Sequence, residues 1–218
     1  MKKILLTICA VALCAGAFAQ NVNCGIKAGI NFSSFTTPNF NGVTERSKTG
    51  FHVGFIVDVA LQQFSIQPGL FFITKGDKSS APYMNVINDQ QSGGAANGSV
   101  RLDYLELPVN LLYHLKVTHD LNFYFGAGGY LGYGRGGRVK EIFTSNGTVV
   151  GTQNDIVTFG NQMNDFKNPD YGVDFLLGER FKHYLIEVNY RLGLTDLNNS
   201  PPKEENRVFG ISLGYMFK

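Results

Sequence analysis

Charged residues are scarce in this sequence of 218 residues. They make up 17 % of the chain, against about 25 % in typical soluble domains. Long apolar runs are scarce as well, because beyond the N-terminus no apolar stretch approaches the roughly 18 residues of a membrane-spanning helix. A chain so poor in charge either hydrates its surface in another way or has a surface that does not face water.

The N-terminus has the pattern of an export signal. Lys2 and Lys3 precede a short apolar stretch, and Ala17-Phe18-Ala19 matches the small-residue pattern that signal peptidase cuts. The sequence therefore predicts a cleaved signal peptide at residues 1–19 and one mature domain at residues 20–218.

Cysteine and net charge are nearly absent from the predicted mature chain. A rival lipoprotein cut before Cys14 requires a small residue at the preceding position, where Leu13 stands. After removal of the signal peptide only Cys24 remains, which excludes an internal disulfide and a metal site built from several cysteines. Loss of the two N-terminal lysines leaves 17 basic against 17 acidic residues, so no electrostatic footprint for nucleic acid remains.

Glycine and aromatic residues are abundant instead. The chain has 26 Gly, 18 Phe and 10 Tyr. So many aromatic residues exclude a disordered chain. Glycine and aromatics together disfavour a helical bundle and favour strands.

Apolar and polar residues alternate with period two, which is typical of strands with two different faces. In one segment Leu107, Val109 and Leu111 alternate with Glu106 and Asn110. Segments of about ten residues are long enough for a tilted strand to cross a bilayer. Eight such segments occur, at about residues 24–33, 51–61, 64–72, 104–113, 121–131, 171–180, 184–193 and 209–217.

The predicted connections alternate between long and short, which is the layout of a bacterial outer-membrane barrel. An even number of strands places both termini at the end with the tight turns, which faces the periplasm. The sequence thus predicts an all-β, eight-stranded, antiparallel up-and-down transmembrane β-barrel. Its long loops span about 34–48, 75–99, 134–168 and 195–206, and its short turns span about 61–63, 116–120 and 181–183.

Charged residues fall on one face of the predicted strands, which must be the inner face. A basic residue on the lipid face at the bilayer midplane costs about 2–4 kcal/mol, and buried charges must be paired or hydrated. We expect an interior polar network that fills the lumen, with Asp174 and Arg191 adjacent across a tight turn. A wet, conducting lumen is the alternative, although eight strands favour a filled one. The predicted network consists of Lys27, Asp58, Glu106, Asp174, Arg180, Glu187 and Arg191.

Several segments resemble the PorT-like family of outer-membrane β-barrels from Bacteroidota. The most specific is Leu102-Asp-Tyr-Leu-Glu-Leu-Pro108, and Gly25–Phe32, Gly126–Tyr130 and Tyr190–Thr195 add to it. The resemblance covers nearly the whole mature chain. It implies insertion into the outer membrane, with its lipid as partner, and no shared enzymatic activity.

Other motifs carry little functional weight. Residues 132–137 fit G-x-G-x-x-G, but the following residues look like a hairpin arm rather than the helix of a dinucleotide site. The four histidines form no metal-binding spacing, and the oxygen-rich segment 161–170 lacks the EF-hand spacing. We therefore predict no catalytic residues, no cofactor and no metal.

The expected function is an integral outer-membrane barrel, non-enzymatic, whose long extracellular loops bind an unknown ligand or protein or serve a structural role. Three alternatives remain open: a narrow pore for small solutes, a membrane-embedded lipid-modifying hydrolase, and a soluble lipocalin-like barrel with the two faces exchanged. The sequence does not identify what the loops bind, the oligomeric state or any role in secretion.

Overall fold

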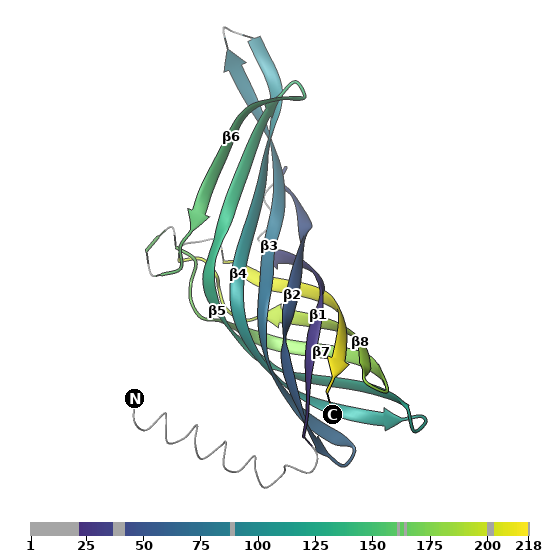
Figure 1. Cartoon of the computed structure of the whole chain (residues 1–218). Coiled ribbons are helices and arrows are strands. Elements are labelled where there is room, and N and C mark those ends of the chain that lie inside the picture. The colour runs from purple at the N-terminus through teal and green to yellow at the C-terminus, as the bar shows by residue number, and fades with distance from the viewer. Residues whose placement is uncertain are drawn as a thin grey trace.

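The computed structural model describes residues 22–36, 42–87, 90–160, 162–163, 165–199 and 203–217. These residues form one antiparallel sheet of nine strands (Figure 1). Among them no helix is long and apolar enough to cross a membrane. The strands are β1 (Val22–Thr36), β2 (Thr44–Leu61), β3 (Phe64–Ile87), β4 (Gln90–Lys116), β5 (Leu121–Ser145), β6 (Thr148–Val157), β7 (Asp170–Phe181), β8 (Tyr184–Gly193) and β9 (Glu205–Met216).

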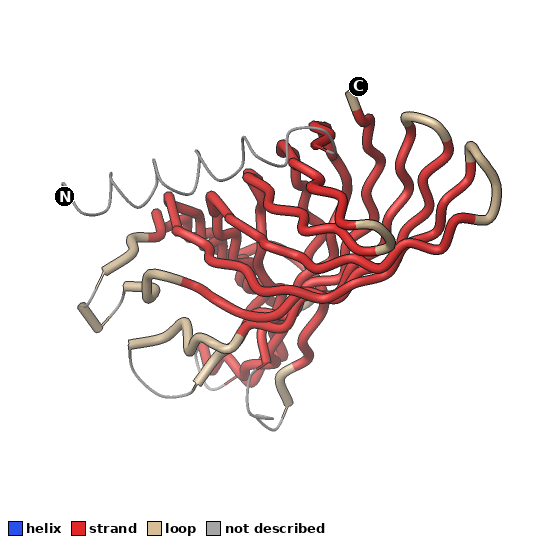
Figure 2. Tube along the Cα trace, turned by 90° about the horizontal axis from the view of Figure 1, so that it is seen from below, coloured by secondary structure: helices blue, strands red, loops and turns tan. Residues whose placement is uncertain are grey.

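Eight of the nine strands close into a ring. Neighbouring strands pair in the order β1, β2, β3, β4, β5, β7, β8 and β9, and β9 pairs back to β1. Figure 2 shows these strands as one continuous curved wall. β6 pairs with β5 alone and lies outside the ring. The predicted eight-stranded antiparallel barrel is therefore confirmed, with one additional strand in a hairpin.

The start of β1 and the end of β9 lie at the end of the barrel with the tight turns. Residues 62–63, 117–120 and 182–183 make the three short connections. Gln62 and Lys182 adopt left-handed backbone conformations, with φ of 59° and 54°, which reverse the chain within two residues. The Phe217 amide donates a hydrogen bond of 2.7 Å to the Cys24 carbonyl, so the last strand closes beside the first.

Two of the predicted long loops are mostly strand. Residues 75–99 continue β3 and β4 as a hairpin, and much of 134–168 continues β5 and returns as β6. These segments rise above the rest of the barrel (Figure 1). The loop prediction is wrong there because it used polar composition as the criterion. Backbone pairing needs no apolar face where water reaches both sides of a hairpin.

The predicted assignment of the two faces is confirmed. In the middle of β4, Leu107, Val109 and Leu111 point outward and are 51–53 % exposed, whereas Glu106 and Asn110 point inward and are 0 % and 4 % exposed. The apolar band thus covers the outside of the wall and the polar residues fill the inside. That is the reverse of a water-soluble barrel with an apolar cavity.

Glycines on the inner face make room for aromatic rings. A Cβ atom on Gly178 would lie 2.4 Å from the Tyr124 ring of the neighbouring strand. Pro68 leaves a gap in the pairing of β3 with β2, between Ile56↔Gly69 and Val59↔Ile66, without changing the register. Proline has no backbone N–H to donate, so an interrupted ladder is the expected effect of this residue within a strand.

Candidate functional site: the barrel interior

Glu106 lies at the centre of the lumen between two basic side chains. Its Oε2 is 2.9 Å from Lys75 Nζ, and its Oε1 accepts a hydrogen bond of 2.5 Å from Arg191 Nη1. The Glu106 and Lys75 side chains are 0 % exposed, and Arg191 is 7 % exposed. One buried carboxylate therefore joins strands β3, β4 and β8 across the barrel.

Two further carboxylates extend this chain of charges. Lys75 Nζ donates to Asp170 Oδ2 at 2.9 Å, and Arg191 Nε lies 3.3 Å from Asp174 Oδ2. Asp174 and Arg191 are direct register partners on β7 and β8, which is the arrangement expected for these two residues. We name Asp170, Lys75, Glu106, Arg191 and Asp174 the central network.

Amides and aromatic rings complete the surroundings of the central network. Asn206 donates a hydrogen bond of 2.8 Å to Asp170, and Asn189 donates one of 3.1 Å to Asp174. Lys75 Nζ lies 4.4 Å from the centre of the Tyr130 ring and 5.0 Å from that of Tyr104. Such contacts offset part of the large desolvation cost of a buried charge.

A second ion pair lies closer to the tight turns. Lys27 Nζ donates to both Glu187 oxygens, at 2.8 and 2.9 Å, and to Gln67 Oε1 at 3.1 Å. Tyr124 donates its hydroxyl proton to Glu187 Oε2 at 3.1 Å. The Lys27 and Glu187 side chains are both 5 % exposed. This pair joins β1 to β8.

The last predicted pair is the loosest. Arg180 Nη1 lies 3.9 Å from Asp58 Oδ2, and the Arg180 side chain is 29 % exposed. Both residues lie near the ends of their strands at the tight turns. All seven residues predicted for the interior network therefore face the lumen, and each lies within 4.0 Å of an opposite charge.

Lys75 and Asp170 are members of the network that the sequence analysis missed. Both lie at the edges of segments assigned to loops. The period of two could have identified both residues. Lys75 lies two residues after the inward-facing Ile73, and Asp170 lies two residues before the inward-facing Gly172 and four before Asp174.

Two apolar layers enclose the polar network. The layer nearer the tight turns comprises seven buried residues, none more than 5 % exposed. The layer at the opposite mouth is completed by residues after β6 and β8, including Phe159, Phe166 and Leu197. The buried members are Ile56, Phe71, Leu112, Tyr124, Leu176, Leu185 and Met216 in the first layer, and Phe35, Ile73, Leu102, Tyr104, Val157, Leu197 and Val208 in the second.

Ser65, His114 and Asn122 contact one another in series, but not with the hydrogen-bond directions of a hydrolase triad. His114 Nε2 lies 2.8 Å from Ser65 Oγ, and the Asn122 amide Nδ2 donates to His114 Nδ1 at 2.8 Å. The neutral ring therefore carries its proton on Nε2 and donates to Ser65, whereas a catalytic histidine accepts the serine proton. Ser65 is 0 % exposed, so an ester carbonyl cannot approach its hydroxyl in this conformation. Among the described residues, no group of three or more His, Cys, Asp or Glu side chains is arranged to hold a metal ion.

A family comparison agrees with this architecture. Residues 18–199 match the model of the outer membrane protein beta-barrel domain. The chain belongs to this family. As an outer membrane beta-barrel domain, it is a protein of the outer membrane. No curated protein sequence matches it.

Solved structures similar to this outer membrane beta-barrel domain are also barrels. Ail of Yersinia pestis, solved with the heparin analogue sucrose octasulfate, has a TM-score of 0.43 at 11 % identity, covering 90 % of this chain and 99 % of Ail. OprG of Pseudomonas aeruginosa has a TM-score of 0.44 at 13 % identity, covering 90 % and 96 %. Neisserial surface protein A has a TM-score of 0.40 at 10 % identity, covering 89 % and 97 %.

Proposed function

We propose that this outer-membrane barrel is a closed, non-enzymatic protein that conducts no solutes and presents its extended hairpins for binding or structural roles. The observation that supports this is the filled lumen. The central network is nearly inaccessible to water, and an apolar layer lies on each side of it. Ions passing through would have to displace paired charges and packed side chains.

The long hairpins define the proposed orientation. Outer-membrane barrels have short periplasmic turns and longer extracellular connections. We therefore place the turns at residues 62–63, 117–120 and 182–183 in the periplasm and the hairpins outside the cell. A signal peptide at residues 1–19, which lies outside the described residues, provides the route to the membrane. The segment Leu102–Pro108 further supports a PorT-like barrel of Bacteroidota.

Planar-bilayer conductance tests the closed lumen. The wild-type protein is expected to give no steady conductance above that of protein-free bilayers. The matched control is the double variant Tyr104→Ala/Phe71→Ala, which removes one aromatic ring from each apolar layer and should admit ions. Steady wild-type conductance that scales with the amount of inserted protein would overturn the closed barrel in favour of a narrow pore.

Lipid hydrolysis tests the non-enzymatic assignment. Folded protein in phospholipid vesicles is expected to release no fatty acid, because the Ser65 hydroxyl is inaccessible. Ser65→Ala serves as the control. Release by the wild type that disappears in this variant would establish the hydrolase alternative.

A further inference from the structure

The wall of the barrel continues beyond its apolar band. The continuous apolar band on the outward face ends at Phe72 on β3, Leu105 on β4 and Tyr133 on β5, which are 36–58 % exposed. Beyond them the sheet continues through residues 44–48, 74–87, 90–103 and 134–157, which we name the extension.

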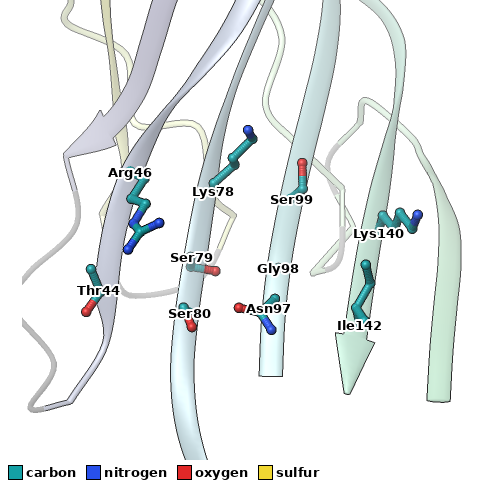
Figure 3. Close-up of a pocket in the computed structure, with 10 residues that line it drawn as sticks. All are labelled: Thr44, Arg46, Lys78, Ser79, Ser80, Asn97, Gly98, Ser99, Lys140 and Ile142. Carbon is teal, nitrogen blue, oxygen red and sulfur yellow. The ribbon is translucent and has the colours of Figure 1, made fainter. Parts of the chain in front are cut away.

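One face of the extension is strongly basic. Arg46 pairs with Lys78, Lys78 with Ser99, and Ser99 with Lys140 in one row across β2, β3, β4 and β5. Directly paired residues of neighbouring strands point to the same side of a sheet. Figure 3 shows the four strands side by side with these side chains. The basic face consists of Arg46, Lys48, Lys78, Arg101, Arg138 and Lys140.

The opposite face of the extension carries acidic residues. Glu45, Asp77, Glu141 and Asp155 occupy the alternate positions of the same strands. Val100, in the same row as Asp77, packs against the apolar layer at the mouth. The basic face therefore points away from the lumen, in the direction of the lipid-facing surface below it.

Most charges on the basic face have no acidic partner. Arg101 contacts Asp103 at 3.1 Å, but within the described part of the chain Arg46, Lys78 and Lys140 form no ion pair. Lys48 Nζ donates to Ser99 Oγ at 2.6 Å. Burial, followed by the nearby charges of Lys78 and Arg101, lowers the pKa of Lys48. A bound anion would relieve this repulsion.

A pocket lies within the basic face. Its volume is about 290 Å³, and its wall includes Arg46, Lys78, Lys140, Asn97 and Ser99 (Figure 3). Three cations beside an amide and a hydroxyl form a donor set suited to phosphate oxygens. The pocket is therefore chemically suited to a phosphate group.

We propose that the basic face binds the phosphate groups of lipid headgroups in the leaflet next to the extension. A lipid source is favoured over a soluble one because this face continues the lipid-facing wall of the same strands. Ile156, the register partner of Arg138, is 83 % exposed on it and provides an apolar contact. The inference rests on the proposed function, because it requires the hairpins to project from the membrane.

Lipid binding can be measured by native mass spectrometry of the folded protein in detergent. The probes are diphosphoryl lipid A and the same lipid after enzymatic removal of its phosphates. The variant Arg46→Gln/Lys78→Gln/Lys140→Gln should bind the phosphorylated lipid roughly 100-fold more weakly, since each basic residue near an anionic lipid surface contributes about fivefold. Wild-type binding should also weaken with salt.

The matched control removes three bases elsewhere. Lys116→Gln/Lys182→Gln/Lys203→Gln carries the same change in net charge and should bind as the wild type does. Equal binding by both triple variants, or equal binding of the dephosphorylated lipid, would overturn the proposal. Competition by inorganic pyrophosphate at concentrations equal to those of the lipid would assign the site to soluble phosphates instead.

Failure of this inference can be distinguished from failure of the proposed function. Heat-modifiable gel mobility reports whether each variant folds as a barrel, and bilayer conductance reports whether its lumen is closed. A folded, non-conducting protein that ignores lipid phosphates would refute the lipid site alone.

Discussion

The net charge of the central network predicts which of two substitutions, Glu106→Gln or Arg191→Met, destabilises the barrel more. Asp170, Glu106 and Asp174 carry three negative charges, against two positive charges on Lys75 and Arg191. The cluster therefore has a net charge of −1. Replacing Glu106 by Gln brings that charge to zero and leaves the Lys75–Asp170 and Arg191–Asp174 pairs in place. We expect Glu106→Gln to lower the free energy of unfolding by only about 1–3 kcal/mol, the range for a lost hydrogen bond to a charged group.

Arg191→Met should destabilise the protein more, although methionine keeps much of the arginine side chain's length. It leaves Glu106, Asp170 and Asp174 facing Lys75 alone and changes the net charge of the cluster from −1 to −2. Removing one partner of a buried ion pair costs about 3–5 kcal/mol. Arg191→Met is therefore expected to lower the free energy of unfolding more than Glu106→Gln does.

The measurement is urea-induced unfolding in lipid vesicles, with the folded fraction taken from unheated gel mobility. Asp120→Asn is the control, because Asp120 and Lys182 are 3.9 Å apart and about half exposed, so that pair contributes less than about 1 kcal/mol. A loss of stability in Glu106→Gln equal to or greater than that in Arg191→Met would refute the charge-balance reasoning.

Three other predictions concern other parts of the molecule. Burial raises the pKa of Asp77, which lies in the extension, to about 6. The folded state therefore binds the Asp77 carboxyl proton more tightly than the unfolded chain does. The free energy of unfolding should fall by about 1 kcal/mol between pH 4 and 6 and stay level above pH 6. Asp77→Asn should remove this pH dependence in urea titrations. Val109→Arg, on the lipid face, should cost about 2–4 kcal/mol, whereas Val150→Arg, similarly exposed on β6, should have little effect; equal losses would contradict the placement of the bilayer. In Gly134→Ala the new Cβ would lie 2.3 Å from the Phe159 ring, so hydrogen exchange should increase at residues 158–160 and 165–168, and unchanged exchange would argue against this contact.

Local alternation made the faces of the wall predictable. A period of two assigns each side chain to one side of a strand without knowledge of its neighbours. The position of Asp174 beside Arg191 could also be inferred, because a two-residue turn joins their strands and fixes the register. Predictions of this kind need only short stretches of sequence.

Contacts across the lumen could not be predicted in the same way. Glu106 and Arg191 are 85 positions apart, and their contact depends on strand tilt and on the stagger of the closed ring. Lys75 and Asp170 were missed because they border polar segments in which the alternation of apolar residues ends. The same polar composition concealed the extension, since hairpins in water need no apolar stripe.

The sequence separation of the interior ion-pair partners determines the stage of barrel assembly at which these pairs can stabilise the fold. Lys27 and Glu187 are 160 positions apart, and Lys75 and Asp170 are 95 apart. Neither pair can form within a single hairpin, because each requires strands from both halves of the chain. Before the ring closes, these charges have no partner and would face lipid if a hairpin entered the membrane alone. That state is costly, and so are the unpaired edges of an open sheet in hydrocarbon. The interior network therefore favours insertion together with closure, and the same ion pairs that fill the lumen make a partly inserted wall unstable.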